Sequence, residues 1–322
     1  MKKNFWQKLP RPFFALAPMA DVTDAAFRHV IAKYGKPDIM FTEFVSCDGL
    51  CSAGKPALLH NFIYDHSQRP IVAQIFGSRP ENFFESAKLV KQLGFDGIDI
   101  NMGCPAKNIQ KQYAGAELIQ HPQLAQEIVA ATKEGAANLP VSIKTRIGIR
   151  TNELETWLPA LLATKPVAIT IHARTRQQMS KVPADWNAIK QAVNIAQKSG
   201  VLIIGNGDVK DLDDARAKAN ITGAAGIMFG RAVFGNPWLF NKKINHTDIS
   251  LKKKLTVLLE HTKLYDKLLG QHKNFAIMKK HFKAYVTGWP GAKELRAKLM
   301  ATENVQQVEK IVKNYLNEHA PS

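Results

Sequence analysis

The sequence predicts an α/β protein, with a (β/α)8 TIM barrel formed by residues 1–242 and a small all-α helical domain formed by residues 243–322. Three observations support this prediction. Short apolar segments recur eight times before residue 242, and stretches of helical composition separate them. After residue 242 the pattern changes to that of amphipathic helices. The 322 residues are 45% hydrophobic, so the chain can bury a core of this size.

The eight apolar segments are the predicted strands of the barrel. Each is almost continuously apolar, which is typical of strands that are covered on both faces. They span residues 14–17, 39–44, 71–76, 97–100, 141–145, 168–171, 201–204 and 226–229, with helical segments such as 81–93, 122–137 and 186–198 between them. A doubly wound open sheet is the alternative fold. No Gly-x-Gly-x-x-Gly motif follows the first strand, which disfavours a Rossmann fold.

Charge and composition narrow the class of protein. Lys and Arg number 44 against 27 Asp and Glu, a formal net charge of +17. The hydrophobic content excludes a disordered polycation, and three cysteines exclude a disulfide scaffold. No run of about 18 apolar residues exists, which leaves no candidate membrane span. The apolar stretch 13–20 resembles a signal peptide, but Pro18 breaks it, so we interpret it as the first buried strand and expect a cytoplasmic protein.

The C-terminal segment differs from the rest in charge and in pattern. Residues 242–322 contain 15 lysines and one arginine against seven acidic residues, a net charge of +9. Apolar residues recur there at helical spacing, at Leu251, Leu255, Leu258, Leu259, Leu268 and Leu269 and then at Phe275, Met278, Phe282 and Tyr285. Residues 245–248 are expected to cap a helix that starts near Ser250. Because the apolar positions are needed to pack these helices, the lysines favour a nucleic acid over a membrane as the partner.

Polar and small residues follow the predicted strands at one rim of the barrel. In barrels of this kind the chemistry lies where the strands end. The residues at these ends are Pro18 and Met19, Glu43, Gln74, Asn101 to Pro105, Lys144 and Arg146, His172 and Arg174, Asn206 to Asp208, and Gly230 with Arg231. Polar groups at the rim of an apolar barrel indicate a small-molecule site.

Two of these rim segments favour a phosphate. The loops after strands seven and eight commonly bind phosphate in barrels, and they carry Gly207, Gly230 and Arg231 here. Glycines let backbone N–H groups approach the phosphate, and an arginine adds a bidentate contact. Lys144 lies within an apolar strand and needs an anionic partner. That partner is either a cofactor that becomes anionic or a carboxylate in a structural salt bridge.

Cys104 is the candidate catalytic residue. It lies between Gly103 and Pro105 on a strand-end loop, where packing requires no thiol. As a thiol it can donate a proton near neutral pH, and as a thiolate it would be a nucleophile that needs a neighbouring base, for which His172 is the candidate.

The remaining cysteines and histidines form no recognisable site. Cys47 and Cys51 have C-x3-C spacing without further ligands at zinc-site spacing, so we interpret both as structural or incidental and expect no metal. No constellation includes His60, His66, His261 or His281, which are therefore expected at the surface.

Several motifs of the chain occur together in one enzyme family. Asp99-Ile100-Asn101-Met102-Gly103-Cys104-Pro105-Ala106-Lys107 resembles the signature of the tRNA-dihydrouridine synthases. Ala17-Pro18-Met19-Ala20, Ile171-His172-Ala173-Arg174-Thr175-Arg176, Asn206-Gly207-Asp208 and Gly230-Arg231-Ala232 resemble further family motifs, in family order, over residues 14–240. The basic tail is similar to the C-terminal helical domain of the family, and the bacterial B-type branch is the most similar one.

The resemblance implies an FMN enzyme that reduces uridines in tRNA to 5,6-dihydrouridine with NADPH or NADH. Cys104 matches the catalytic proton donor. The residues that match flavin contacts are Ala17, Pro18, Met19, Gln74, Lys144 and His172, with Asn206, Gly207, Asp208, Gly230 and Arg231 on the phosphate and ribityl side. Asn101 matches a residue near the target base. Lys107, Lys111, Arg174, Arg176 and Lys181 are expected to contact the RNA backbone.

The implied mechanism makes Cys104 an acid and not a nucleophile. Hydride adds to C6 of the uracil, and the Cys104 thiol protonates C5. Lys144 offsets the charge of the reduced flavin. The sequence departs from the family at Ala173, where a glycine is usual, and the added methyl group is expected to crowd a backbone that approaches the phosphate.

Two other functions are compatible with parts of the sequence. An FMN barrel that acts on a free pyrimidine, similar to dihydroorotate dehydrogenase, needs no helical tail of charge +9. A non-enzymatic RNA-binding protein has no need of Cys104, Lys144 and Arg231 together. We expect tRNA and a nicotinamide dinucleotide as partners, and a monomer, because no exposed heptad pattern favours assembly.

Overall fold

The computed structural model describes residues 4–245 and 248–319. It contains the eight predicted strands, each within two residues of its predicted ends: β1 (Phe13–Leu16), β2 (Met40–Ser46), β3 (Ile71–Phe76), β4 (Gly97–Met102), β5 (Val141–Arg146), β6 (Ala168–His172), β7 (Leu202–Asn206) and β8 (Gly226–Phe229). All pair in parallel in the order β1-β8-β7-β6-β5-β4-β3-β2. A parallel bridge between Ala15 and Ile39 joins β1 to β2, so the two ends of the sheet meet. The predicted eight parallel strands, curled into a TIM-barrel-like sheet, are confirmed.

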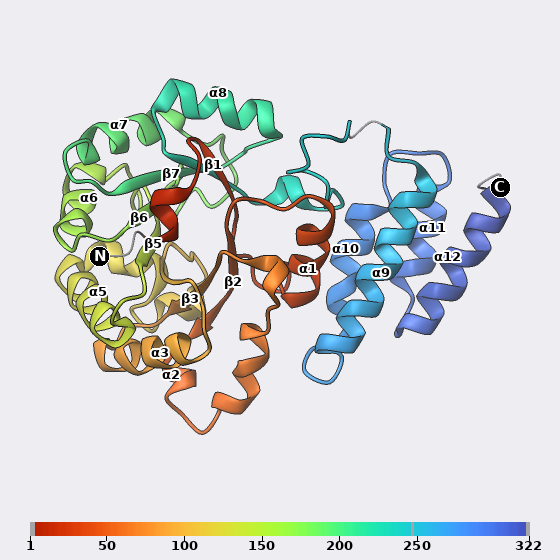
Figure 1. Cartoon of the computed structure of the whole chain (residues 1–322), viewed down its shortest axis with the longest axis horizontal. Helices are drawn as coiled ribbons and strands as arrows, with labels where there is room; N and C mark the ends of the chain where they lie inside the picture. The colour runs from red at the N-terminus through yellow and green to blue at the C-terminus, as the bar shows by residue number, and fades with distance from the viewer. Residues whose placement is uncertain (1–3, 246–247, 320–322) are drawn as a thin grey trace.

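Helices surround the sheet (Figure 1). The longer ones are α1 (Ala25–Tyr34), α3 (Pro80–Gln92), α5 (Pro122–Ala136), α6 (Leu154–Ala163), α7 (Trp186–Ala196) and α8 (Leu212–Thr222), and the short ones are α2 (Cys47–Leu50) and α4 (Lys107–Gln110). Short 3-10 helices add Phe5–Lys8, Lys55–Phe62, His66–Gln68, Gly115–Gln120 and Arg231–Val233. Aspartates at the N-caps fix several starts; Asp185, for example, accepts the N–H groups of Asn187 and Ala188.

Successive residues of the strands face two different cores. Phe14 and Leu16 of β1 belong to the large cluster that the strands share with the surrounding helices. Phe13, Ala15 and Ala17 belong to a smaller cluster that also contains residues of β2, β3, β6, β7 and β8, and which therefore fills the barrel interior. Trp6 packs on Phe13 at the start of β1, with ring centroids 5.9 Å apart, and covers the interior at the end remote from the rim.

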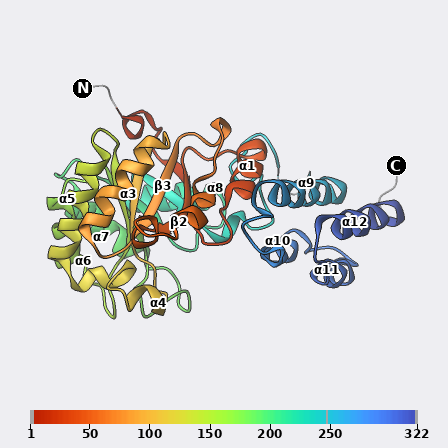
Figure 2. The ribbon, with the colours of Figure 1, turned by 90° about the horizontal axis from the view of Figure 1, so that it is seen from below.

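The C-terminal helices lie to one side of the barrel, beyond α1 (Figures 1 and 2). They are α9 (Leu251–Leu269), α10 (Met278–Tyr285), α11 (Ala292–Met300) and α12 (Val305–His319), with a 3-10 turn at Phe275–Ile277. Their apolar cluster also includes Ala26 and Val30 of α1 and Trp238, so these helices and the barrel share buried surface. No described helix is long and apolar enough to cross a membrane.

Two sequence-based expectations for this region need correction. The side chain that caps α9 is Ser250, which accepts the N–H of Lys253 at 3.2 Å; of the predicted cap 245–248, His246 and Thr247 lie outside the described residues. His261 and His281 are fully buried and not at the surface. They pack against each other and against Phe27 of α1, with ring centroids 4.5–5.3 Å apart. Aromatic packing between α1, α9 and α10 explains this burial. The sequence does not reveal it, because histidine is a residue type that is usually exposed.

Gly235 allows the close contact between the barrel and α10. It has φ +69°, and a Cβ there would lie 2.2 Å from the carbonyl oxygen of Ala284. Gly200 has a similar φ of +75° but open space around it. We expect G200A to cost about 1 kcal/mol from backbone strain alone, and G235A about 3 kcal/mol because the clash adds to that strain. Urea unfolding measures both, and equal losses would show that this contact adjusts freely.

Candidate active site

A cavity of about 460 Å³ opens at the carboxyl ends of the strands. Its size lies within the range of about 300–1,000 Å³ that is usual for small-molecule sites. The residues that line it are Ala17, Pro18, Met19, Lys144, His172, Arg174, Ser180, Asn206, Gly207, Asp208, Val209, Lys210, Gly230 and Arg231. Every predicted cofactor residue except Gln74 is among them. The barrel rim therefore brings together side chains from β1, β5, β6, β7 and β8, as the strand-end pattern predicts.

One wall of the cavity is cationic. The carboxylate of Asp208 binds two guanidinium groups, those of Arg174 and Arg231, the latter at 2.6 Å. Partial burial acts to raise the pKa of Asp208, but the Ala184 N–H and the two arginines outweigh it and hold the pKa below its ordinary value. With Lys144 and Lys210 also at the cavity, one carboxylate faces four cationic groups. This excess suits an anionic ligand.

Two glycines shape the backbone beside this wall. Gly207 has φ +133°, and a Cβ there would meet the Ala184 Cβ at 2.8 Å. At Gly230 the nearest atom to an added Cβ is the Met19 sulfur, 3.8 Å away. The missing side chain of Gly230 thus leaves space at the cavity, through which a ligand can approach the backbone. These features match what a phosphate group requires.

Lys144 makes no ion pair with any described residue. Its Nζ lies 3.3 Å from the amide oxygen of Asn206. Burial, assisted by the nearby Arg146, lowers the pKa of Lys144 to about 8. One interpretation of Lys144 is a structural salt bridge. The described residues form no such salt bridge, so its ammonium group remains available to a ligand in the cavity.

His172 is neutral and already engaged. Burial, followed by the positive charges around it, lowers its pKa to about 2. Its Nε2 lies 3.2 Å from an Arg174 guanidinium nitrogen, which can only donate, so Nε2 is the acceptor. The alternative in which His172 acts as a base toward Cys104 does not fit this geometry.

Asn101 holds the loop that carries Cys104. Its amide oxygen accepts the N–H groups of Gly103 and Cys104 at 3.1 and 3.0 Å, and its amide nitrogen donates to Gln74. Gln74 in turn donates to the buried carboxylate of Asp99 at 2.7 Å, which also accepts Ser142. Gln74 thus lies outside the cavity lining and acts on Cys104 through Asn101. Asp99, which the strand pattern treats only as part of an apolar run, anchors this chain of hydrogen bonds.

Arg146 fixes the other side of the same loop. Its Nε donates to the carbonyl of Gly103 at 2.8 Å, and one guanidinium nitrogen donates to the carbonyls of Thr175 and Met179. Its side chain is almost fully buried. Arg146 therefore ties the Cys104 loop to the loop after β6. The sequence places it at the rim but gives no indication of these three carbonyl partners.

Cys104 remains a thiol at neutral pH. Burial raises its pKa, and this effect exceeds the opposing influence of the Ala106 N–H, Arg146 and Lys144. Its side chain is half-buried, so it can still meet a substrate. A protonated, partly accessible thiol beside a cationic cavity suits a proton donor and not a thiolate nucleophile.

The predicted RNA-contacting residues do not share one environment. Lys107, Lys111 and Lys181 are exposed. Arg176 is half-buried and donates to Gln110, so it joins the loop after β6 to α4. The expectation that Arg174 contacts the RNA backbone is wrong, because its side chain is 2% exposed and binds Asp208 and the Val182 carbonyl. It is a residue of the cavity wall.

Ala173 does not crowd the cavity. Its N–H donates to the Asn206 carbonyl at 2.9 Å, and its methyl group lies in the core between the sheet and the helices. The expected interference with a phosphate is therefore absent. Among the residues that the structure describes, no group of three or more His, Cys, Asp or Glu could hold a metal.

Comparisons with known proteins show to which family the chain is similar. The model of the dihydrouridine synthase family matches residues 15–320. A probable tRNA-dihydrouridine synthase of Staphylococcus aureus (strain COL) is 39% identical over 98% of this chain and 96% of its own length. Probable tRNA-dihydrouridine synthase 2 of Bacillus subtilis (strain 168) is 38% identical over 98% of this chain and 97% of its own.

Solved structures with low sequence identity share the fold. 2-Naphthoyl-CoA reductase aligns with a TM-score of 0.56 at 12% identity, over 71% of this chain and 49% of its own. 6-Hydroxypseudooxynicotine amine oxidase from Pseudomonas geniculata N1 aligns with a TM-score of 0.55 at 12% identity, over 90% of this chain and 56% of its own. This chain therefore spans about half of each, and at this low identity the likeness concerns the fold alone. With the family match over nearly its whole length, the chain belongs to the dihydrouridine synthase family.

Proposed function

We propose that this protein reduces particular uridines of tRNA to 5,6-dihydrouridine, with FMN as the bound cofactor and NADPH or NADH as the source of electrons. The observation that supports it most directly is the Cys104 loop, which Asn101 and Arg146 hold beside a cationic cavity at the barrel rim. The family and the named relatives point to the same reaction.

The cavity residues fit a flavin mononucleotide. Arg231, Lys210 and the open backbone at Gly230 suit its phosphate, whereas Ala17, Pro18 and Met19 offer an apolar wall for a flat ring. Lys144 has no carboxylate partner among the described residues and suits the part of the ring that gains negative charge on reduction. His172, held neutral and oriented by Arg174, provides a hydrogen-bonding edge.

The residues of this protein carry out the proton-transfer part of the reaction. When bound, reduced FMN supplies the hydride that adds to C6 of the uracil. The Cys104 sulfur then gives its proton to C5, so the C5–C6 double bond becomes a single bond with one hydrogen added to each carbon. Asn101 and Arg146 keep Cys104 in place through its backbone. A proton from solvent restores the thiol.

The RNA is the substrate that explains the uneven charge. A uridine inside folded tRNA has to leave its stack to reach the cavity, which requires contacts to the flanking backbone. We propose that residues 243–322 form a basic tRNA-binding domain with residues 1–242 as the catalytic domain, and that Lys107, Lys111, Lys181 and Arg176 add contacts near the rim.

The test uses the purified protein and an unmodified tRNA transcript. We expect a yellow protein, and in the presence of NADPH or NADH a uridine that gains two hydrogen atoms by mass spectrometry of the digested tRNA. Parallel reactions contain uracil or orotate in place of tRNA. Reduction of a free pyrimidine but not of tRNA would favour the dihydroorotate dehydrogenase-like alternative, and RNA binding without bound flavin would favour the non-enzymatic one.

A further inference from the structure

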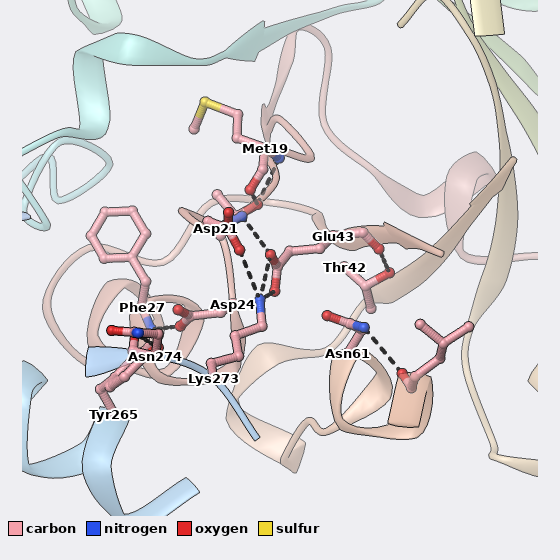
Figure 3. A network of polar contacts seen from close by, with 12 residues as sticks. Met19, Asp21, Asp24, Phe27, Thr42, Glu43, Asn61, Tyr265, Lys273 and Asn274 are labelled. Atoms are coloured by element: carbon pink, nitrogen blue, oxygen red, sulfur yellow. Dashed lines mark hydrogen bonds and ion pairs between the residues drawn. The ribbon is translucent and has the colours of Figure 1, made fainter. Parts of the chain in front are cut away.

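A buried carboxylate on β2 connects the cavity wall to the C-terminal helices. The Glu43 side chain is 5% exposed and that of Lys273, which follows α9, is 9% exposed. The Lys273 ammonium lies 2.8 Å from both oxygens of Glu43 (Figure 3). Glu43 also accepts the backbone N–H of Asp21 at 2.6 Å. The Glu43 carboxylate thus joins the loop after β1 to Lys273 of the C-terminal region. Glu43 and Lys273 are 230 positions apart in the sequence.

The loop that Glu43 holds presents Met19 to the cavity. Residues 19–23 form a tight turn, in which the Met19 carbonyl accepts the N–H groups of Val22 and Thr23 and the Met19 N–H donates to the Thr23 hydroxyl. Asp21, within this turn, has φ +54°. Such a conformation costs a non-glycine residue about 1–2 kcal/mol, so it persists only when the surroundings fix it. The bond from Asp21 to Glu43 supplies that restraint.

Lys273 is the cation that makes a buried Glu43 possible. The neighbouring Asp24 is buried too, and burial, followed by the charge of Glu43, raises its pKa to about 6. Arg28 is fully engaged with Gln68 and with the carbonyls of Thr23 and Ile63. Lys280 lies 3.6 Å from Asp21, its side chain is 44% exposed, and it forms no ion pair with Glu43 among the described residues. Without Lys273, Glu43 would be a buried charge without a cation in direct contact, which is strongly unfavourable.

We infer that Glu43 and Lys273 are a pair of positioning residues that set the turn bearing Met19, and thereby make flavin binding in the cavity depend on the C-terminal helices. The inference rests on the proposed function only in taking the ligand to be FMN. Neither residue lines the cavity. Glu43 acts through the backbone N–H of Asp21, and Lys273 acts through Glu43 and through the Asp21 carboxylate, which lies 3.4 Å from its ammonium group. Through this turn both act on the apolar wall at Met19.

The test measures FMN dissociation from the holoenzyme variants by the fluorescence of released flavin on dilution, together with Tm. We expect K273M to raise the Kd for FMN about tenfold, which corresponds to about 1.4 kcal/mol. The matched control is K263M, because Lys263 forms a similar 2.8 Å pair with Glu309 that is remote from the turn. It is expected to leave the Kd within about twofold of the wild-type value.

Two double variants separate positioning from stability. E43Q/K273M removes both charges but keeps an amide oxygen for the Asp21 N–H, so it is expected to restore FMN affinity. E43A/K273M removes that acceptor and is expected not to restore it. Equal Kd values for these two variants, or a K273M protein with lowered Tm and unchanged Kd, would refute the inference. A wild-type protein that never binds FMN would instead refute the proposed function.

Discussion

Replacement of Cys104 by alanine is expected to lower the rate of dihydrouridine formation by about 100- to 10,000-fold while FMN remains bound. That range is typical of the loss of a positioned general acid. Burial raises the pKa of this thiol, so the residue enters the reaction carrying its proton. Cys104 is not among the residues that line the cavity, which is why the cofactor should not be lost with the side chain.

Single-turnover kinetics give the clearest measurement of this effect. The enzyme is reduced in advance, tRNA is added, and flavin reoxidation is followed by absorbance. C51A is the matched control, because Cys51 is an exposed thiol that does not line the cavity and should leave the rate unchanged. C104S is expected to remain slow, since a hydroxyl is a far weaker acid than a thiol. Wild-type rates for C104A would show that water or another group supplies the proton to C5.

The position of Cys104 was predictable from the sequence, whereas its support was not. A thiol between Gly103 and Pro105, directly after an apolar strand, is a local signal. The hydrogen-bond chain from Asp99 through Gln74 to Asn101 crosses two strands, and its members are separated by 25 and 27 residues. Spacing along one chain contains no information about such register-dependent contacts. The parallel pairing of β3 with β4 creates them.

The charged residues also show which contacts the sequence alone does not predict. The sequence assigns Arg174 and Arg231 to different tasks, one on RNA and one on a phosphate. In the fold, Asp208 accepts both guanidinium groups, and the loop after β7 brings this carboxylate to the ends of β6 and β8. An arginine count predicts a basic surface. Which arginines are exposed depends on carboxylates that are distant in sequence.

The strands were predictable for a physical reason that the C-terminal region lacks. A strand covered on both faces has to be apolar throughout, so its composition alone marks it. The buried seam between α1, α9 and α10 instead contains His261 and His281, polar residues that sequence analysis assigns to the surface. Their four ring nitrogens have no hydrogen-bond partner in the described structure. The two buried histidines of this seam therefore lower the free energy of unfolding by an amount that depends on pH.

Acid is expected to weaken the fold through this histidine pair. Burial lowers the pKa of His281 to about 3, and burial with the proximity of His281 lowers that of His261 well below its ordinary value. Unfolded histidines bind protons below about pH 6.5, whereas the folded ones stay neutral, so the free energy of unfolding falls as pH falls through that value. At pH 5 each histidine accounts for a loss of about 2 kcal/mol, or about 4 kcal/mol for the pair.

Other groups act in the opposite direction, so a difference measurement is needed. Burial raises the pKa values of Asp24 and Asp99 to about 6, which stabilises the folded state as pH falls from about 6 toward 4. The positive charge of the adjacent Lys280 also lowers the pKa of His281. The contributions of the two aspartates are common to the wild-type protein and to H261F/H281F, in which two rings of similar shape cannot take up a proton.

Urea unfolding of both proteins at pH 7.5 and at pH 5 isolates the contribution of the pair. Between these values the wild-type protein is expected to lose about 4 kcal/mol more than H261F/H281F, as two buried neutral imidazoles require. H66F removes an exposed histidine and should follow the wild-type protein. Equal changes in the free energy of unfolding of all three proteins would contradict this expectation. The buried rings would then have to be reached by water or protons without separation of α1 from α9 and α10. Because Phe27 packs on both rings, charging them should act first at this seam, where the C-terminal helices meet the barrel.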